Sequence, residues 1–443
     1  MSQHQHPTRR AFIGTTAAAS TLATRTGRAA TLAVNGGTPV RTTPFNPWPE
    51  VFGDSEKQIL DVLHSGEWFR KKWNKRDAHR VDQFEQEYAA ACGVKFTLAT
   101  SCGTTALQCA LEAADVQPGD EVLLSCYTFC ATANSIFEQK ALAVFVDTEP
   151  DTFQIDPARI EEKITPRTRA IIPVHYGGYP CDMDAVNAIA KRHNLIVIED
   201  ACQSHLSKYR GKSCGALGDM GCFSFQVSKP LPAGEGGALT TNNETFHDAA
   251  RWYHDTGINR KQPAGHSVHG MNYRMTEWQA TILLEALKGL DERVQHVHDN
   301  VQYFNKLVSD VPGFAPAKFV DGGERGTHYV YLARYYSEKF KGLPRDAFMR
   351  AMKAEGIPVG GGYDKPLSEE GLVEHTLNSR GFQRIYSPKE LNQYRKTLDC
   401  PVTREICGSS VSLKHWLFMG SRKDVAQIAE AVHKVYESAD SIG

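Results

Sequence analysis

Short apolar runs alternate with amphipathic stretches between about residues 95 and 245, and this alternation predicts the main part of the fold. The apolar runs are rich in β-branched residues, whereas the stretches between them repeat their apolar residues at helical spacing. The predicted strands are LATS (98–101), EVLLSC (121–126), AVFVDTE (143–149), RAIIPVHY (169–176) and NLIVIED (194–200), and the predicted helices are TTALQCALEAA (104–114), PARIEEKI (157–164) and MDAVNAIAKRH (183–193). This order favours right-handed crossovers and a mostly parallel sheet buried on both faces. Ligands bind such sheets at the carboxyl ends of the strands, so the residues that follow the strands are the candidates for chemistry.

The pattern changes after a long helical segment at residues 275–310. The runs that follow are the β-rich YVYLARYY (329–336) and two amphipathic helices at 344–356 and 425–436. They predict a smaller α+β domain packed on the first. We therefore expect an α/β protein with a large domain at residues 31–295, including an N-terminal segment, and a small C-terminal domain at residues 296–443.

Composition narrows the class of partner. Lys and Arg together number 50 and Asp and Glu number 51, so no overall charge attracts nucleic acid or an anionic membrane surface, and a small-molecule substrate fits better. The 11 cysteines are scattered without a CxxC pair or zinc-like spacing, which predicts neither a disulfide framework nor a metal site. Several lie inside apolar runs, where a reduced thiol behaves as a small hydrophobic side chain.

The first 30 residues contain the pair Arg9-Arg10 followed by a weakly apolar run and a basic GRAA. This arrangement is typical of a twin-arginine export signal, which carries folded proteins to the periplasm and would reconcile free cysteines with export. The alternative is a terminal tail in which the arginine pair arose by chance, and the protein would then be cytoplasmic. No later run is long enough to span a bilayer, so no stable membrane insertion is expected.

Candidate chemistry begins at three strand ends. Gly103 and Thr104 open a helix after the first strand, where free backbone N–H groups and a hydroxyl could hold a phosphate, although an ordinary capped turn has the same pattern. Phe129 follows the second strand and could stack on a flat ring or simply pack in the core. Glu199 and Asp200 end the fifth strand, where a carboxylate could keep a pyridine nitrogen protonated, and chemistry alone does not choose between them.

Lys229 lies between the run FSFQVS and the glycine-rich GEGG, in a place where partial desolvation would make its amine a nucleophile. A solvated surface lysine is the alternative that any single lysine allows. The segment GMNYRMTE (270–277) is a polar stretch before a long helix, with Thr276 as a cap.

Taken in order, GTxAL, YTF, EDAxQ, SFxxxKxxxxGEGG and NYRMTEWQA resemble the DegT/DnrJ/EryC1/StrS family of sugar aminotransferases, from about Leu32 to Val435. The resemblance implies the type I fold of the pyridoxal 5'-phosphate (PLP) transferases, a homodimer with shared sites, and Lys229 as the Schiff-base lysine. It implies cofactor contacts as follows: Asp200 at the pyridine nitrogen, Phe129 on the ring, Gln203 near the ring hydroxyl, Gly103, Thr104 and Ser224 at the phosphate, and Asn272 at the phosphate of the neighbouring subunit.

Within the family, NGGTPVRTTPFNPWP and SGEWFR are similar to the branch of scyllo-inosose aminotransferases and 3-amino-5-hydroxybenzoate synthases. Two departures, Cys102 in place of Ser or Asn and Leu206 in place of Gly, concern the shape of the pocket. The substrate implied is a keto-sugar or keto-cyclitol, with glutamate or glutamine as the amino donor. His175, His205 and Tyr363 are candidates for substrate contact, with a structural or capping role open for each.

Two other functions remain open. A PLP-dependent dehydratase is the first; Lys229 argues against the sugar 3-dehydratases, which carry histidine there, but not against an aromatising synthase that retains the lysine. A PLP-binding protein without turnover is the second, because ligands of a cofactor do not by themselves establish activity.

Overall fold

The computed structural model describes residues 31–70, 79–259 and 266–442, and its centre is a seven-stranded sheet. The strands in sheet order are β1 (Phe96–Thr100), β9 (Gly237–Thr241), β8 (Met220–Ser224), β5 (Ile196–Asp200), β4 (Thr168–Ile172), β2 (Glu121–Ser125) and β3 (Leu142–Val146). Neighbouring strands from β8 to β3 are parallel, and β9 runs antiparallel to both of its neighbours. The predicted mostly parallel sheet is therefore confirmed.

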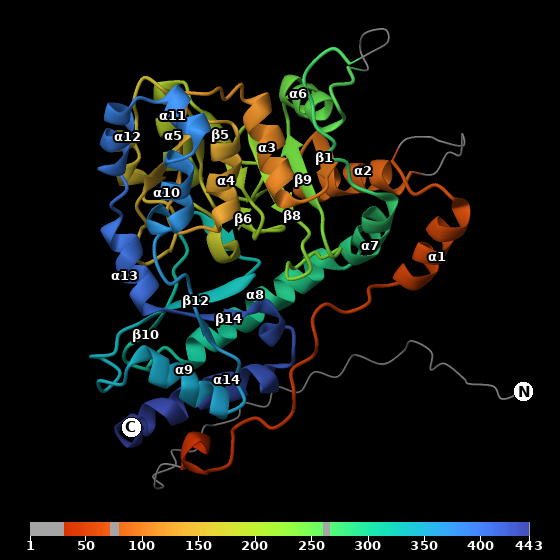
Figure 1. The fold of residues 1–443 in the computed structure, drawn as a ribbon. Helices are drawn as coiled ribbons and strands as arrows, with labels where there is room; N and C mark the ends of the chain where they lie inside the picture. The colour runs from red at the N-terminus through yellow and green to blue at the C-terminus, as the bar shows by residue number, and fades with distance from the viewer. Residues whose placement is uncertain (1–30, 71–78, 260–265, 443) are drawn as a thin grey trace, which may run out of the picture.

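Helices cover both faces of this sheet (Figure 1). They are α2 (Arg80–Cys92), α3 (Gly103–Ala113), α4 (Cys130–Glu138), α5 (Met183–His193), α6 (Glu244–His254) and α7 (Glu277–Leu287). Successive side chains of a strand point to opposite faces. In β2, Val122 and Leu124 pack in the core beneath α3 and α4, whereas Leu123 packs in the core beneath α5. Burial on both faces explains why these strands read as nearly continuous apolar runs in the sequence.

A second, antiparallel sheet lies beside the first. Its strands in order are β10 (Phe314–Pro316), β12 (Val330–Tyr335), β14 (Ser410–Lys414) and β13 (Gly360–Gly361). The helices α8 (Leu290–Leu307), α9 (Arg345–Ala354) and α14 (Arg422–Glu437) pack against it around a separate apolar core. A small three-stranded sheet joins β11 (Gly323–Arg325), β6 (Lys208–Tyr209) and β7 (Lys212–Ser213).

Helix α8 connects the two apolar cores. Its first residues Leu290 and Val294 pack with the helices of the large sheet, whereas Val297 and Val301 pack in the core of the second sheet. The domain division expected at residue 295 falls inside this helix and stays a prediction.

Three local expectations differ from the structure. Residues 157–164 form two short 3-10 turns, Pro157–Arg159 and Glu161–Lys163, and not one helix. The long helix expected at 275–310 is divided between α7 and α8 near Gly289, a residue with low helix propensity.

The third difference is a group of helices that the pattern did not indicate: α10 (Gly371–Leu377), α11 (Arg380–Ile385), α12 (Pro388–Arg395) and α13 (Pro401–Ser409). Although they follow the second sheet in sequence, α10 to α12 return to the large sheet and pack in its core through Leu377, Phe382 and Leu391 (Figure 1).

Residues 32–41 form an N-terminal strap, which precedes α1 (Ser55–Ser65) and crosses the second sheet's helices. The buried carboxylate of Glu355 accepts the backbone N–H groups of Ala33 (2.8 Å) and Val40 (2.9 Å). Arg41 pairs with Asp424 of α14 at 2.7 Å. The strap therefore depends on groups that lie more than 300 residues later in the chain.

None of the helices in the described ranges is long and apolar enough to cross a membrane.

Candidate active site

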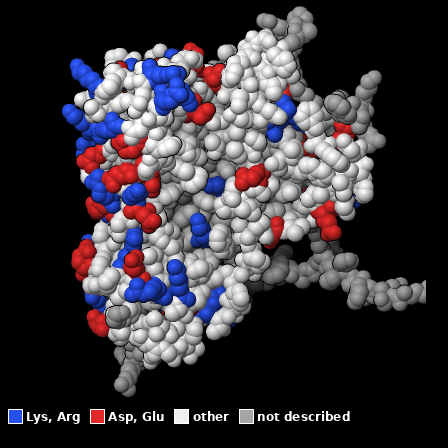
Figure 2. Space-filling model, viewed as in Figure 1, with Lys and Arg blue, Asp and Glu red and all other residues white. Residues whose placement is uncertain are grey.

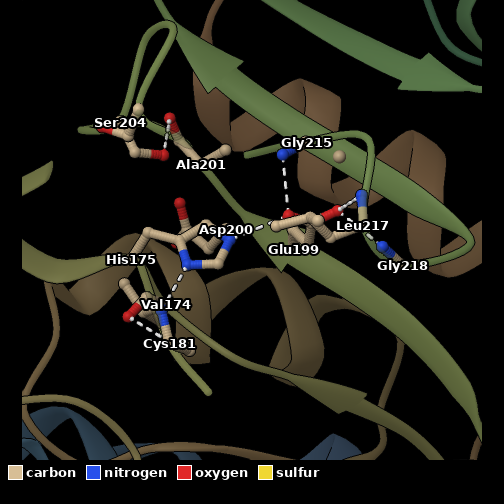
Figure 3. A network of polar contacts seen from close by, with 12 residues as sticks. Val174, His175, Cys181, Glu199, Asp200, Ala201, Ser204, Gly215, Leu217 and Gly218 are labelled. Atoms are coloured by element: carbon tan, nitrogen blue, oxygen red, sulfur yellow. Dashed lines mark hydrogen bonds and ion pairs between the residues drawn. The ribbon is translucent and has the colours of Figure 1, made fainter. Parts of the chain in front are cut away.

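Adjacent acids at the end of β5 point in opposite directions, as the alternation of a strand requires. Glu199 is fully buried in the scaffold. Its carboxylate accepts the backbone N–H groups of Gly215, Leu217 and Gly218, each at 2.7 Å, and Nε2–H of His175 at 2.8 Å (Figure 3). Glu199 therefore has a structural role, because its carboxylate is fully used in these hydrogen bonds. Of the two acids, only Asp200 faces the cavity.

Asp200 lines a cavity of about 630 Å³ at the carboxyl end of the sheet. Its Oδ2 accepts the hydroxyl of Thr132 at 2.8 Å and its Oδ1 accepts the backbone N–H of Cys202 at 3.2 Å. The residue is only 6% exposed. A carboxylate held in this way at low effective dielectric is suited to bind a protonated ring nitrogen.

Helix α3 begins at the edge of the same cavity with Gly103 and Thr104. The N–H groups of a helix's first turn have no partners within the helix and favour an anion. A Cβ on Gly103 would lie 2.8 Å from Cβ of Ser224 and 2.9 Å from Sγ of Cys202, so only glycine permits this close packing. Thr105 caps the helix reciprocally with Cys102, which leaves Thr104 as the threonine that lines the cavity.

Lys229 enters the cavity from the turn that follows β8. The turn is fixed by backbone hydrogen bonds from Lys229 to Gln226 (2.8 Å) and from Val227 to Gly234 (2.9 Å). The Nζ atom of Lys229 lies 4.1 Å from the centre of the Tyr329 ring. The structure therefore gives this lysine a defined place inside a cavity, and the solvated-surface alternative does not hold.

The cavity gathers most of the residues that the sequence singled out. The predicted site residues that line it are Gly103, Thr104, Phe129, Asp200, Gln203, Ser224, Lys229 and Tyr363. Phe129 is 58% exposed, so it is not the packed core residue that the alternative supposed. The Gln203 side-chain oxygen accepts the N–H of Gly177 at 2.8 Å, which leaves its NH₂ group to face the cavity. The roles of these residues toward a cofactor stay predictions.

Asn272 does not line the cavity of its own chain. It is exposed, and its backbone pairs with Asp255 in an isolated bridge. A position outside its own cavity is compatible with the role in a neighbouring subunit that the resemblance implies.

The two histidines proposed for substrate contact lie behind the cavity wall. His175 is fully buried between Glu199 and the backbone N–H of Cys181, which its Nδ1 accepts at 3.0 Å. His205 is also fully buried, with its ring nitrogens 2.9 Å from the Tyr88 hydroxyl and from the Ser224 carbonyl. Burial lowers the pKa of His205 to about 3, so the ring is neutral. Because every ring nitrogen already has a partner, the geometry corrects the expectation of substrate contact in favour of the structural role.

Sequence reasoning missed the cavity wall that the second sheet supplies. Tyr329 precedes β12 and Lys414 ends β14, and both line the cavity together with Ser412. Neither residue belongs to a recognisable motif. Only the pairing of β12 with β14, which joins segments about 80 residues apart, brings them to Lys229.

The pKa values of two side chains that line the cavity, Cys202 and Tyr329, are shifted by burial and by nearby charges. Burial raises the pKa of the Cys202 thiol well above its ordinary value, and the Asp200 carboxylate raises it further, so this thiol stays protonated. Burial alone would raise the pKa of Tyr329, but the charges of Lys229 and Lys414 lower it below its ordinary value.

Comparison with known proteins gives one consistent result. The model of the DegT/DnrJ/EryC1/StrS aminotransferase family matches residues 55–433. The L-glutamine:2-deoxy-scyllo-inosose aminotransferase of Streptoalloteichus tenebrarius is 34% identical over 416 residues, which are 91% of this chain and 97% of that protein.

Solved structures agree with the fold. The crystal structure of 3-amino-5-hydroxybenzoic acid synthase superposes with a TM-score of 0.78 at 26% identity and covers 90% of this chain and 100% of that one. An aminotransferase from Psychrobacter cryohalolentis superposes with a TM-score of 0.76 at 28% identity and covers 89% and 99%. The expected type I PLP-transferase fold is confirmed.

Replacement of Glu199 tests the scaffold behind the cavity. In wild type, four N–H donors share the Glu199 carboxylate. Glu199→Gln replaces one acceptor oxygen with an NH₂ group that faces some of these donors, so we expect the variant's free energy of unfolding to be lower by about 3 kcal/mol. Urea unfolding followed by circular dichroism measures the change. The exposed Glu338→Gln is the matched control and should stay within about 0.5 kcal/mol of wild type. Equal unfolding midpoints for the two variants would contradict the assigned role of Glu199.

Proposed function

Because this chain belongs to the DegT/DnrJ/EryC1/StrS aminotransferase family, we propose that it transfers the amino group of glutamine to a keto-cyclitol with PLP as cofactor. The observation that carries the proposal is the meeting of Lys229, Asp200 and the N-terminus of α3 in one cavity. The family is PLP-dependent, and the enzyme is an aminotransferase by membership. Bound PLP supplies a carbonyl carbon for amines and an electron sink for the α-carbon of the donor.

The donor set of the cavity fits this cofactor. The Asp200 carboxylate, fixed by Thr132, suits the protonated ring nitrogen. At Gly103 and Thr104, the unpaired N–H groups and the positive end of the helix dipole of α3 suit the phosphate. The remaining assignments follow the family: Phe129 on the ring face, Gln203 at the ring hydroxyl and Ser224 at the phosphate.

Lys229 would both hold the cofactor and move protons. Once the amine of glutamine has taken its place, the free Nζ would accept the proton from the donor's α-carbon and deliver it to the cofactor carbon that Lys229 had held. The reverse sequence would serve the keto substrate. Tyr329 keeps Nζ close to this position, since its ring lies 4.1 Å away and its hydroxyl is 3.0 Å from Ser228 Oγ. The side chain of Ser228 is itself fixed by Gln226 at 2.7 Å.

The substrate class rests on the relatives. Several proteins at 32–36% identity are named as glutamine aminotransferases of scyllo-inosose derivatives, which supports a cyclitol ketone over a nucleotide-linked sugar. The likeness to 3-amino-5-hydroxybenzoic acid synthase keeps a second candidate, an aromatising PLP enzyme that eliminates water.

Spectroscopy separates these functions. Wild-type protein supplied with PLP should show a visible absorbance band that borohydride removes, and glutamine should convert it to the spectrum of the aminated cofactor. Lys229→Ala should abolish the borohydride-sensitive band and lower amino transfer by at least about a thousandfold, since it removes the proton carrier. Lys212→Ala, at an exposed lysine of β7, should retain both properties. No response to any amino donor would favour dehydration or mere binding.

We also propose that the working unit is a homodimer with shared sites. An apolar groove of about 620 Å³ lies beside the Lys229 turn, lined by α1 and by Val51, Leu60 and Val227. Val51 is 80% exposed and Leu60 is 46% exposed, so the groove leaves large apolar side chains open to solvent, as is typical of a surface that binds another protein. Figure 2 shows charged side chains crowded along the edge formed by α10 to α13 and sparser over the middle of this face. A second copy is the occupant that would also bring Asn272 to the cavity of its neighbour.

Subunit complementation tests the shared site. Lys229→Ala and Asn272→Ala each should inactivate a homodimer, but a hybrid purified through two different tags contains one site with both native residues. The hybrid should therefore recover about half of the wild-type activity. A hybrid as inactive as its parents would contradict sharing, as would a monomeric active enzyme.

The predicted twin-arginine signal lies at residues outside the described ranges, and we propose that it directs export. Its Arg9-Arg10 pair is the element that such a pathway reads. Changing both arginines to lysine should retain the precursor inside the cell, which cell fractionation and immunoblotting would detect. Export of the double variant at the wild-type level would contradict this proposal.

A further inference from the structure

A second lysine lines the cavity and has no part in the chemistry assigned so far. Lys414 is the last residue of β14, and in the described part of the chain it and Lys229 are the cationic residues that line the cavity. Its Nζ lies 5.3 Å from the centre of the same Tyr329 ring that Lys229 approaches to 4.1 Å. The ring of Tyr329 is thus in cation–π contact with both ammonium groups.

The ammonium of Lys414 has no counter-charge among the described residues. It forms no hydrogen bond or ion pair with any of them, although the residue is half-buried. The two carboxylates that line the cavity do not supply one, because Asp200 is fixed by Thr132 and the Cys202 N–H, and Glu235 is exposed in the glycine-rich turn. A partly desolvated cation without an anion is unfavourable, unless an anion arrives with a ligand.

The chemistry of an α-amino acid supplies such an anion. The amine of the donor must reach the carbon that Lys229 holds, and its α-carboxylate is attached one carbon away. A cation near Lys229, other than Lys229 itself, is the group best suited to bind this carboxylate. Lys414 meets both conditions, since the two Nζ atoms share the Tyr329 ring.

We propose that Lys414 binds the α-carboxylate of the amino donor and so makes the cavity selective for α-amino acids over other amines. The inference rests on the proposed function, because it supposes that an amino acid enters this cavity. The cyclitol substrate carries hydroxyl groups and no carboxylate, so the lysine should matter less for the second substrate than for the first.

Two ligands and two variants test this assignment in the PLP-loaded enzyme. α-Methylglutamine keeps the amine and carboxylate but lacks the α-proton, so calorimetry measures its binding without amino transfer. Glutaminol has a hydroxymethyl group in place of the carboxylate. We expect Lys414→Met to weaken α-methylglutamine binding on the order of tenfold or more, and to raise by a similar factor the glutamine concentration needed for half-conversion of the cofactor spectrum. The response to glutaminol should change little.

Controls exclude a general structural effect. Lys414→Arg keeps the charge and should retain the preference for glutamine over glutaminol. Lys339→Met removes a lysine that lies 4.9 Å from another tyrosine ring, Tyr336, on the surface, and should behave as wild type. An unchanged absorbance spectrum in Lys414→Met before donor is added shows that the site is folded and loaded.

The outcomes are distinct. A wild-type enzyme that neither binds α-methylglutamine nor responds to glutamine would overturn the proposed function itself. If wild type responds and Lys414→Met has the same glutamine dependence, the assignment of Lys414 is wrong. Equal weakening of glutamine and glutaminol would also overturn it, as would an effect confined to the KM of the keto substrate.

Discussion

The cavity depends on one buried carboxylate that never faces it. Glu199 gathers three backbone N–H groups and the imidazole of His175, so it binds the loop at Gly215 and the turn after β4 to the end of β5. That turn carries the Gly177 N–H that orients Gln203. Because strand residues alternate, fixing Glu199 inward also fixes Asp200 toward the cavity. The end of β5 therefore carries both the residue that holds the scaffold, Glu199, and the residue that faces the cavity, Asp200. A neutral residue in place of Glu199 would disturb the position of Asp200.

Sequence reasoning reached the half of the site that the parallel sheet builds. Strand ends in such a sheet meet at one edge, so Gly103, Asp200 and Lys229 could be placed together from local pattern and resemblance. Tyr329 and Lys414 could not, because their meeting depends on the pairing of β12 with β14, and no local signal encodes a long-range pairing. Nor could pattern show that His175 lies behind the wall, since one strand end carries residues directed both into the cavity and away from it.

The two sheets contribute different properties to the cavity. Lys229 and Asp200 come from the large sheet and form the part that suits a cofactor, whereas Tyr329 and Lys414 come from the second sheet and form the opposite wall. Since α8 belongs to both apolar cores, the two walls are joined by a continuous helix and not by a flexible linker. Substrate preference can then change through the second sheet while the cofactor half is retained.

The N-terminal strap has a consequence for the order in which the molecule assembles. Ala33 and Val40 find their acceptor in Glu355, and Arg41 finds Asp424 in the last long helix. The ribosome synthesises the chain from its N-terminus, so residues 32–41 are made long before Glu355 and Asp424, with which they form these contacts. The large sheet can collapse earlier, around segments already made. Closure of the strap is then a late event, and residues 32–41 are among the last of the described residues to reach their final contacts.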